Sequence, residues 1–306
     1  MLVSTIIPTY NRAETIERAV NSVLDQTWKE MEVIVVDDGS TDETVEVLKK
    51  YGDKIRVIRQ KNGGPAAARN TGIKAATGEI IAFLDSDDSW MPAKIERQVN
   101  LLQRTASAGV VCCVCNARMM YSSGAVTTFQ LARLHPEQVE GVWRNPADIL
   151  VDRFLLFNQV VAVYREALSQ SGFFGEDLPY GLHDDYDLAV RLSLIGPWAF
   201  IADPLVEWHE QKDNISRTHR HLEVCIHTLQ ILKNINESQQ FQGRLPQARL
   251  SRRLRSLKNW IYALRLENDG NPLMRLLGRC LHFYLRIYEA LYSRIVPVSQ
   301  MITNKA

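Results

Sequence analysis

Short apolar runs alternate with longer amphipathic segments over the first hundred residues of the chain. The runs are rich in β-branched residues and have the length of buried strands; they occupy residues 2–7, 31–36, 54–58 and 79–84. The segments between them have the spacing of amphipathic helices; they occupy residues 13–26, 42–50 and 66–76. Strands and helices in this alternation form parallel sheets with right-handed crossovers. The pattern predicts an α/β fold with a Rossmann-like, mostly parallel sheet flanked by helices.

Residues with ligand-binding chemistry follow three of the predicted strands. The first strand is followed by Pro8 and Tyr10, the second by Asp37 and Asp38, and the fourth by Asp85-Ser86-Asp87-Asp88. Ligands of parallel sheets bind beyond the carboxyl ends of the strands, so these side chains are expected to share one site. Carboxylates this close repel one another and raise one another's pKa unless a cation or hydrogen-bond donors neutralise them, and Mg²⁺ or Mn²⁺ carrying a diphosphate is the cation expected. A metal-dependent nucleotide site is therefore predicted at this edge.

Two common classes of nucleotide-binding protein are disfavoured by what the sequence lacks. No GxGxxG segment follows the first strand, which argues against a dinucleotide-binding dehydrogenase. No GxxxxGK[ST] segment occurs, which argues against a P-loop nucleotide hydrolase. The formal net charge is only +1, so no nucleic-acid partner is expected. A nucleotide would have to be held through its base and a metal ion.

Four sequence segments in this order and spacing resemble glycosyltransferase family 2. They are STIIPTYNRAETIERAVNSVLDQT, VIVVDDGSTDET, NGGPAAARNTG and GEIIAFLDSDDSWMP. A fifth segment, GLHDDYDLAVRLSLIG, follows where the family has its catalytic motif, and the resemblance covers roughly residues 3–209. It implies a GT-A fold and inverting transfer of a sugar from a nucleoside diphosphate sugar.

The resemblance assigns residues to the donor nucleotide. Pro8, Tyr10 and Asp38 are expected to hold the base, usually uracil, through a ring that stacks and a carboxylate that accepts the imide N–H. Arg69 lies in the ARN segment of the third motif. It either reaches the donor or forms a salt bridge with the loop of the fourth motif, and both alternatives stay open.

The resemblance also assigns residues to the metal. The family's DxD motif is Asp85-Ser86-Asp87, with Asp87 the expected direct ligand of Mn²⁺ or Mg²⁺ and Asp85 nearer the ribose or a metal-bound water. His209, after predicted strands at residues 199–201 and 205–208, is a further candidate for the metal or the diphosphate. A lone histidine in this position is as readily explained by a structural role.

The fifth motif implies a catalytic base. Family members have an arginine six residues beyond their catalytic aspartate, and Asp185 and Arg191 have this spacing. Inverting transfer needs one carboxylate that takes the proton of the acceptor hydroxyl, which makes Asp185 the candidate. Asp184 stands where the family more often has glutamate. Asp187 is expected to be a helix-start charge that interacts favourably with the helix dipole; Asp184 either has the same role or tunes the base or the acceptor, and both alternatives stay open.

The predicted domains are a GT-A domain at residues 1–215 and a basic helical extension at residues 216–306. Within the first, residues 1–105 form the nucleotide-sugar half and residues 106–215 the half that carries the acceptor site and the base. Residues 241–306 contain twelve Lys or Arg and three Asp or Glu. One apolar stripe in the extension is Leu276, Leu277, Cys280, Leu281, Tyr284, Tyr288 and Leu291. Such stripes pack on the protein itself, on a partner or on an anionic membrane.

The predicted function is inverting transfer of a sugar, with a UDP-sugar favoured as donor, to a hydroxyl of a glycan or lipid-linked acceptor. Polysaccharide or glycoconjugate biosynthesis is the expected role. A sugar-nucleotide-forming nucleotidyltransferase and a non-catalytic nucleotide-sugar-binding scaffold are the alternatives. No signal peptide or membrane span is evident, and five cysteines with three in VVCCVC fit a reducing compartment. A cytoplasmic enzyme, peripheral on the cytoplasmic face of the membrane, is therefore expected.

Overall fold

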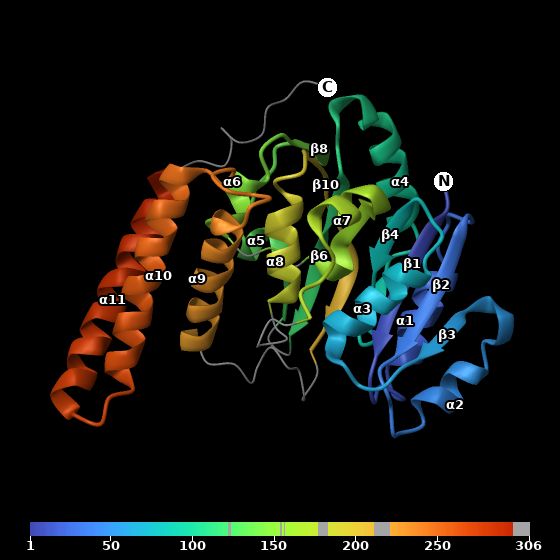
Figure 1. Ribbon diagram of the computed structural model, residues 1–306, viewed down its shortest axis with the longest axis horizontal. Helices are drawn as coiled ribbons and strands as arrows, with labels where there is room; N and C mark the ends of the chain where they lie inside the picture. Colours follow the sequence, from blue (N-terminus) through green and yellow to red (C-terminus); the bar gives the residue numbers. More distant parts are fainter. Residues whose placement is uncertain (122–123, 154, 156, 177–182, 211–220, 296–306) are drawn as a thin grey trace.

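One ten-stranded sheet runs through the protein, with helices on its faces (Figure 1). The computed structural model describes residues 1–121, 124–153, 155, 157–176, 183–210 and 221–295. The strands are β1 (Val3–Thr9), β2 (Met31–Asp37), β3 (Arg56–Arg59), β4 (Ile80–Phe83), β5 (Ser89–Trp90), β6 (Cys112–Tyr121), β7 (Gly124–Thr127), β8 (Glu140–Trp143), β9 (Val161–Tyr164) and β10 (Trp198–His209). The α-helices up to β10 are α1 (Ile16–Leu24), α2 (Thr44–Lys49), α3 (Gly64–Ala75), α4 (Lys94–Arg104), α5 (Thr128–Leu131), α6 (Ala147–Leu150), α7 (Arg165–Ser171) and α8 (Asp184–Leu192).

The strand order is β3-β2-β1-β4-β9-β6-β10-β5, with β7 beside β6 and β8 beside β10. The first four strands are parallel neighbours. β9 is antiparallel to both β4 and β6, and β10 is parallel to β6. The carboxyl ends of β1, β2, β4, β6 and β10 therefore lie along one edge of the sheet. The predicted α/β fold with a mostly parallel sheet is confirmed.

Strand β1 is longer than its sequence suggests, because it passes through Pro8 instead of ending before it. The carbonyl of Ile6 accepts the amide of Leu84 next to β4, and the carbonyl of Thr9 accepts the amide of Asp38 next to β2. Backbone groups alternate between the two sides of a strand, so Pro8 faces the β4 side. Pairing with β4 ends at Ile6, and the missing N–H of Pro8 therefore interrupts no ladder bond.

Strand β10 is a second departure from the sequence pattern, which indicates two short strands where the structure has one of twelve residues. Its pairing with β6 shifts register on each side of Pro204. Such shifts absorb a proline without ending the strand. β10 thus reaches the same edge as β4 and places His209 at its last position.

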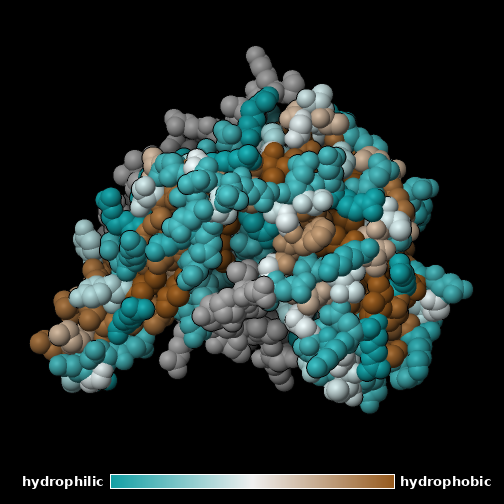
Figure 2. Space-filling view, viewed as in Figure 1, coloured by the Kyte–Doolittle hydropathy of each residue, from teal (hydrophilic) through white to brown (hydrophobic). Residues whose placement is uncertain are grey.

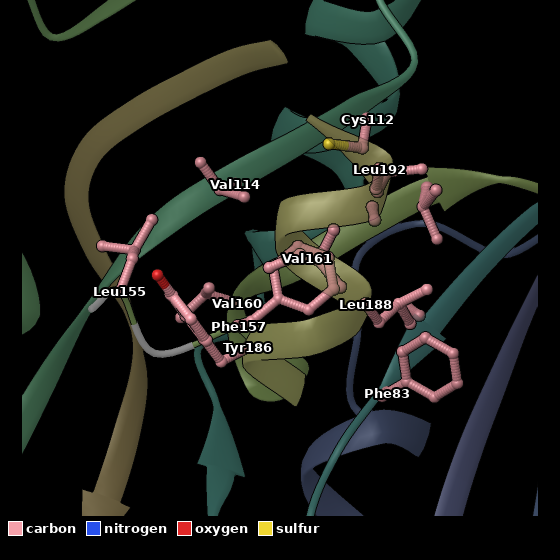
Figure 3. Packing of buried hydrophobic residues seen from close by; sticks show 14 of the residues in the cluster. Phe83, Cys112, Val114, Leu155, Phe157, Val160, Val161, Tyr186, Leu188 and Leu192 are labelled. Carbon is pink, nitrogen blue, oxygen red and sulfur yellow. The ribbon is translucent and has the colours of Figure 1, made fainter. Parts of the chain in front are cut away.

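Helix α8 is fixed to the sheet by its buried face. Figure 3 shows Leu188 and Leu192 of α8 among Phe83, Phe157 and Val161 of the sheet and the turn before β9. A fully buried leucine contributes roughly 1.5–3 kcal/mol to stability. The Tyr186 hydroxyl also donates to the carbonyl of Leu150 at 2.8 Å. These contacts hold the first turn of α8 in a defined place relative to β4.

Three further helices form the carboxyl-terminal extension: α9 (His221–Glu237), α10 (Gln247–Glu267) and α11 (Pro272–Ile295). They lie side by side, with α9 nearest α8 and α10 between α9 and α11 (Figure 1). Leu232 and Leu257 are buried in the common core, and Arg249 pairs with Asp152 of the main body at 2.9 Å. Helices α9 and α10 therefore pack on the protein itself. The predicted domain boundary near residues 215 and 216 lies outside the described residues.

Part of the apolar stripe predicted for α11 lies outside the face that packs; Leu281 of the stripe does pack against the core, and the side chains of Tyr288 and Leu291 lie outside the described residues. Leu276, Leu277 and Tyr284 are 58%, 51% and 62% exposed, whereas Leu285 is buried. Gly278 faces α10 closely, because a Cβ there would lie 2.5 Å from the backbone nitrogen of Glu267. The small glycine sets the packing face, and this turns that part of the stripe outward. In Figure 2 apolar residues are accordingly visible at the surface over α10 and α11. Within the described residues, no helix combines the length and apolarity that a membrane span requires.

Candidate active site

Hydrogen bonds join the end of β1 to the loop after β2. The Asn11 amide donates to Ser40 Oγ at 2.9 Å, and the Thr41 amide donates to Asn11 Oδ1 at 2.8 Å. Asn11 has a φ of 51°, a left-handed conformation that asparagine tolerates better than most residues. Pro8 is buried in β1, and Tyr10 is 45% exposed just beyond it. The tyrosine ring is thus presented to solvent beside a rigid loop, as stacking on a base requires.

Asp38 is buried, and its carboxylate organises the start of α3. Its Oδ1 accepts hydrogen bonds from Gln60 Nε2 at 2.7 Å and the Gly63 amide at 2.9 Å. Its Oδ2 accepts one from the Gly64 amide at 2.8 Å. A carboxylate has about four lone-pair sites, and these three donors leave room for roughly one more. The expected contact with the imide N–H of a base would use that position.

Asp85 immediately follows β4 and is held on both carboxylate oxygens. Its Oδ1 accepts a hydrogen bond from Arg69 Nη2 at 2.8 Å. Its Oδ2 accepts one from Nε2 of Gln159, which lies just before β9. Ser86 follows and is buried. With both oxygens engaged, Asp85 is better placed to orient the loop than to ligate a metal directly.

Asp87, like Asp85, is partly exposed, and Arg12 Nε lies 3.9 Å from its Oδ2. Burial and repulsion from Asp85 raise the pKa of Asp87 to about 6, although Arg12 lowers it. The Arg18 side chain donates to the backbone carbonyl of Asp87. The raised pKa of Asp87 reflects the repulsion that the sequence predicts between crowded carboxylates. A bound cation would offset this repulsion.

Asp88 connects the DxD loop to the end of β10. Its Oδ1 accepts the backbone amide of His209 at 3.0 Å, and its Oδ2 accepts Gln159 Nε2 at 2.9 Å. Burial, then repulsion from Asp87 and Asp85, raise the pKa of Asp88 well above its usual value. His209 Nε2 lies 3.2 Å from Ser89 Oγ, and burial lowers the pKa of its imidazole. His209 therefore stands beside the loop with a ring that favours the neutral form.

Arg69 joins the donor loop to the first turn of α8. Its Nη1 donates to Asp184 Oδ2 at 2.8 Å while its Nη2 holds Asp85. Its guanidinium carbon lies 5.3 Å from the ring centroid of Phe174. Burial alone would lower the pKa of Arg69, but Asp85 and Asp184 raise it, so the cation is retained. Of the two roles left open for Arg69, the salt bridge with the DxD loop is present.

Asp185 follows Asp184 in the first turn of α8 and is partly buried. Burial and repulsion from Asp184 raise the pKa of Asp185 to about 7, although Arg69 lowers it. Its Oδ1 accepts the amide of Tyr186 at 2.7 Å. Arg191 pairs with Asp187 at 2.9 Å and donates to the carbonyl of Gly172, so it fixes the turn after α7. A carboxyl with a pKa near 7 is suited to accept a proton at neutral pH.

A divalent ion fits this site through Asp87. Among the described residues, no group of three or more His, Cys, Asp or Glu side chains is assembled as a ready metal cage. Mg²⁺ and similar hard cations are commonly held by one or two carboxylates together with substrate phosphates and water, and need no such cage. Asp87 offers the carboxylate, while Asp85 lies two residues before it and His209 is hydrogen-bonded to Asp88, the next residue.

Several residues of the site carry no signal that sequence reasoning used. Gln159 bridges Asp85 and Asp88 from the turn before β9, and Asp184 forms an ion pair instead of standing as a simple helix-start charge. Both contacts join segments more than 70 residues apart in the chain. The contacts of Gln159 depend on β9 lying beside β4, and the ion pair of Asp184 depends on the first turn of α8 lying beside α3; local sequence patterns encode neither.

Comparison with known proteins agrees with this geometry. The family model described as glycosyl transferase family 2 matches residues 4–170, more than half of the chain. The chain belongs to glycosyl transferase family 2. The predicted resemblance is thereby confirmed, and the matched residues include every candidate of the donor edge from Pro8 to Asp87.

Relatives and solved structures extend the family assignment. A glycosyltransferase of Rickettsia felis, itself uncharacterized, is 32% identical over 229 residues, 73% of this chain and 37% of that protein. WfaP of Escherichia coli, a UDP-Glc:alpha-D-GlcNAc-diphosphoundecaprenol beta-1,3-glucosyltransferase, is 47% identical over 105 residues, 33% of this chain and 41% of its own. The aligned regions thus span about two fifths of these two family 2 relatives.

Two solved structures share the fold at low sequence identity. S. aureus TarS 1–349 in complex with UDP-GlcNAc has a TM-score of 0.65 and 20% identity, and the match covers 88% of this chain and 75% of that TarS chain. The mannosyltransferase PcManGT of Pyrobaculum calidifontis, in complex with GDP-Man and Mn²⁺, has a TM-score of 0.55 and 22% identity. The match covers 95% of this chain and 84% of PcManGT. The GT-A fold expected of a family 2 member is confirmed.

Proposed function

We propose that this family 2 member transfers a sugar from a nucleoside diphosphate sugar to an acceptor hydroxyl, with inversion at the anomeric carbon. The proposal rests on one observation: Asp185, with a pKa raised to about 7, follows directly the aspartate that Arg69 ties to the DxD loop. A proton acceptor and a donor-binding loop are thereby held in one rigid arrangement. A nucleotidyltransferase or a non-catalytic scaffold would have no use for a base so placed.

The donor we propose is a UDP-sugar. Tyr10 would stack on the base, Pro8 would support its rim, and the remaining lone pair of Asp38 would accept the imide N–H of uracil. WfaP is named for an activity that uses UDP-Glc, and TarS forms a complex with UDP-GlcNAc. PcManGT binds GDP-Man, so the fold alone does not select uridine. The exposed ring and the buried carboxylate beside it support the choice of uridine here.

Mn²⁺ or Mg²⁺ is proposed as the cofactor, with Asp87 as its direct ligand. Asp85 and His209 are further candidates for contact with the ion or with its bound water. PcManGT is an example of this fold with Mn²⁺ bound beside a nucleotide sugar. When bound, the ion neutralises charge that develops on the departing diphosphate. Arg12, 3.9 Å from Asp87, adds positive charge on the same side.

The chain's own residues then account for the displacement. The acceptor oxygen forms a bond to C1 of the sugar on the face opposite the diphosphate, and the bond from C1 to the diphosphate oxygen breaks. The proton of the acceptor hydroxyl passes to the carboxylate of Asp185. One displacement of this kind inverts the anomeric configuration. The acceptor proposed is a hydroxyl of a glycan or of a lipid-linked sugar; the enzyme name of WfaP specifies alpha-D-GlcNAc-diphosphoundecaprenol as its acceptor.

The activity is tested by incubating the protein with UDP-, GDP- and TDP-sugars and Mn²⁺ or Mg²⁺, and measuring release of the nucleoside diphosphate. Lipid-linked and free glycans serve as acceptors. We expect turnover with a UDP-sugar and an inverted product by NMR. A product that keeps the donor's anomeric configuration would exclude direct displacement, and absence of turnover and of donor binding with every sugar nucleotide would overturn the proposed function.

The pH profile gives a further prediction. Asp185 acts only when it is deprotonated, and its pKa is raised to about 7. We therefore expect kcat/KM to fall about tenfold for each pH unit below about 7, since this limb reports the base in the free enzyme. An Asp185→Asn variant should keep no such limb in its residual activity. A wild-type profile that is flat down to pH 5 would contradict the assignment.

Attachment to an anionic membrane surface is proposed for α11. Its exposed face combines apolar side chains with cations: Leu273, Leu276, Leu277, Phe283 and Tyr284 with Arg275, Arg279 and Arg286. Residues 272–286 contain no Asp or Glu, so a second copy of this face would be repelled. Anionic headgroups attract each basic residue near the surface by roughly 1 kcal/mol, and the apolar side chains add burial.

Co-sedimentation with vesicles tests this attachment. We expect binding to phosphatidylglycerol-rich vesicles at low salt, at least tenfold weaker binding to phosphatidylcholine vesicles, and weakening by salt. Leu276→Glu with Leu277→Glu should reduce binding at least tenfold. Leu131→Glu is a matched control, because Leu131 is 56% exposed on α5. Binding that does not depend on lipid charge, or that is unchanged by the double substitution, would contradict attachment of this face to an anionic membrane. A protein partner would then be the remaining explanation of the exposed face.

A further inference from the structure

A chain of three charged side chains, of which Arg69 and Asp184 are buried and Asp85 is partly exposed, links the loop after β4 to the first turn of α8. Asp85, Arg69 and Asp184 are linked by two ion pairs of 2.8 Å, both made by the one guanidinium of Arg69. The side chains of Arg69 and Asp184 are 7% and 5% exposed. Asp85 stands at the end of β4, Arg69 within α3 and Asp184 at the start of α8.

We infer that Asp184 is a positioning residue of the transferase. Its ion pair with Arg69 keeps the neighbouring Asp185 at a fixed position relative to the bound donor. The inference rests on the proposed transfer reaction and extends it by giving a function to the aspartate next to the base. Because Arg69 has one guanidinium for two carboxylates, a shift of either carboxylate moves the other. The DxD loop and the first turn of α8 therefore behave as one rigid unit.

The burial of the Arg69–Asp184 pair argues that this contact is specific. Breaking a buried ion pair by removing one partner is strongly destabilising, because the other charge is left without compensation. A carboxylate present only to favour the helix dipole lies at the surface and contributes about 0.3–1 kcal/mol. Asp184 is instead enclosed, and burial raises its pKa although Arg69 lowers it. A protein gains little from such a group unless its position matters.

The geometry also distinguishes two ways in which Asp184 could act. If it bound the donor directly, its loss would weaken donor affinity as much as turnover. If it acts through Arg69, its loss would leave the donor site formed, since Arg69 still holds Asp85. The displaced element would be Asp185, and misplacement of a reacting group by about 1 Å can cost roughly 10²-fold in rate.

The test compares Asp184→Asn, Asp184→Glu, Arg69→Gln and the double variant Arg69→Gln with Asp184→Asn. Three quantities are measured for each: the Kd for UDP with Mn²⁺ by calorimetry, kcat and KM for transfer, and the thermal midpoint. We expect Asp184→Asn to lower kcat about 10- to 100-fold while the Kd for UDP changes less than threefold. Asp184→Glu, which restores the charge, should recover most of kcat.

The double variant decides whether the effect runs through Arg69. If the effect runs through Arg69, adding Asp184→Asn to the Arg69→Gln variant should lower kcat by less than a further threefold. The free-energy effects of two coupled substitutions are not additive. Wild-type kcat in Asp184→Asn, fully multiplied losses in the double variant, or a Kd that rises as much as kcat falls would each overturn the inference. If the wild-type protein transfers no sugar, the proposed function fails, and the same cycle on thermal midpoints still reports whether the two residues are coupled.

Discussion

Replacement of Asp185 by asparagine is expected to lower kcat by about 10² to 10⁴-fold, the range that a general base contributes. Asparagine has nearly the same size and can still accept the amide of Tyr186, so the first turn of α8 should persist. It cannot take the proton of the acceptor hydroxyl. Steady-state kinetics should therefore show the loss in turnover, with the Kd for UDP and Mn²⁺ within about threefold of wild type.

A matched control for this substitution is Glu166→Gln. Glu166 is an exposed acid in the first turn of α7, where it contributes a helix-dipole interaction of about 0.3–1 kcal/mol. Its loss should leave kcat unchanged. Asp184→Asn is unsuitable as a control because its carboxylate is paired with Arg69. Full activity in the Asp185→Asn variant would show that another residue acts as the base.

Replacement of Asp87 by alanine is expected to abolish the metal dependence of donor binding. Outer-shell partners of a metal site cost about 10- to 100-fold in metal affinity when lost, and a direct ligand should cost at least as much. The protein should remain folded, because removing Asp87 also removes its repulsion with Asp85, one cause of its raised pKa. Calorimetric titration of UDP with and without Mn²⁺ measures the effect.

Asp53→Ala provides the comparison for this second substitution. Asp53 is an exposed acid in the turn before β3, and its loss should change neither the Kd for UDP nor its dependence on Mn²⁺. The Asp87 assignment would be refuted by a metal-dependent gain in UDP affinity that is the same in Asp87→Ala as in wild type. In that event Asp85 and His209 would be the next candidate metal ligands to test.

The sequence predicts the donor edge well because its signals are local. A β-branched run followed by Asp85-Ser86-Asp87, or by Asp37 and Asp38, requires only that strands alternate with helices. The shared edge then follows from parallel pairing. The family motifs lie on these same strand ends. Their expected contacts with a nucleotide and a metal stay predictions.

The features that sequence missed depend on the environment of a residue in the folded chain. Pro8 is compatible with β1 only because pairing with β4 has ended at Ile6. The outward part of the α11 stripe is decided by Gly278, which lets the other face approach α10. Asp184 acquires its ion pair from a residue 115 positions away. None of these can be inferred from helical or strand periodicity alone.

The place of β9 within the sheet has a consequence for how the protein is made. Residues 161–164 lie between β4 and β6, so the second half of the chain supplies a strand to the middle of the sheet. Until these residues leave the ribosome, β4 remains an open edge of four buried apolar residues. Such an edge is prone to pair with other chains. A fragment cut at residue 105 would therefore aggregate during expression, and the sheet around β4 is completed only after residue 164 has left the ribosome.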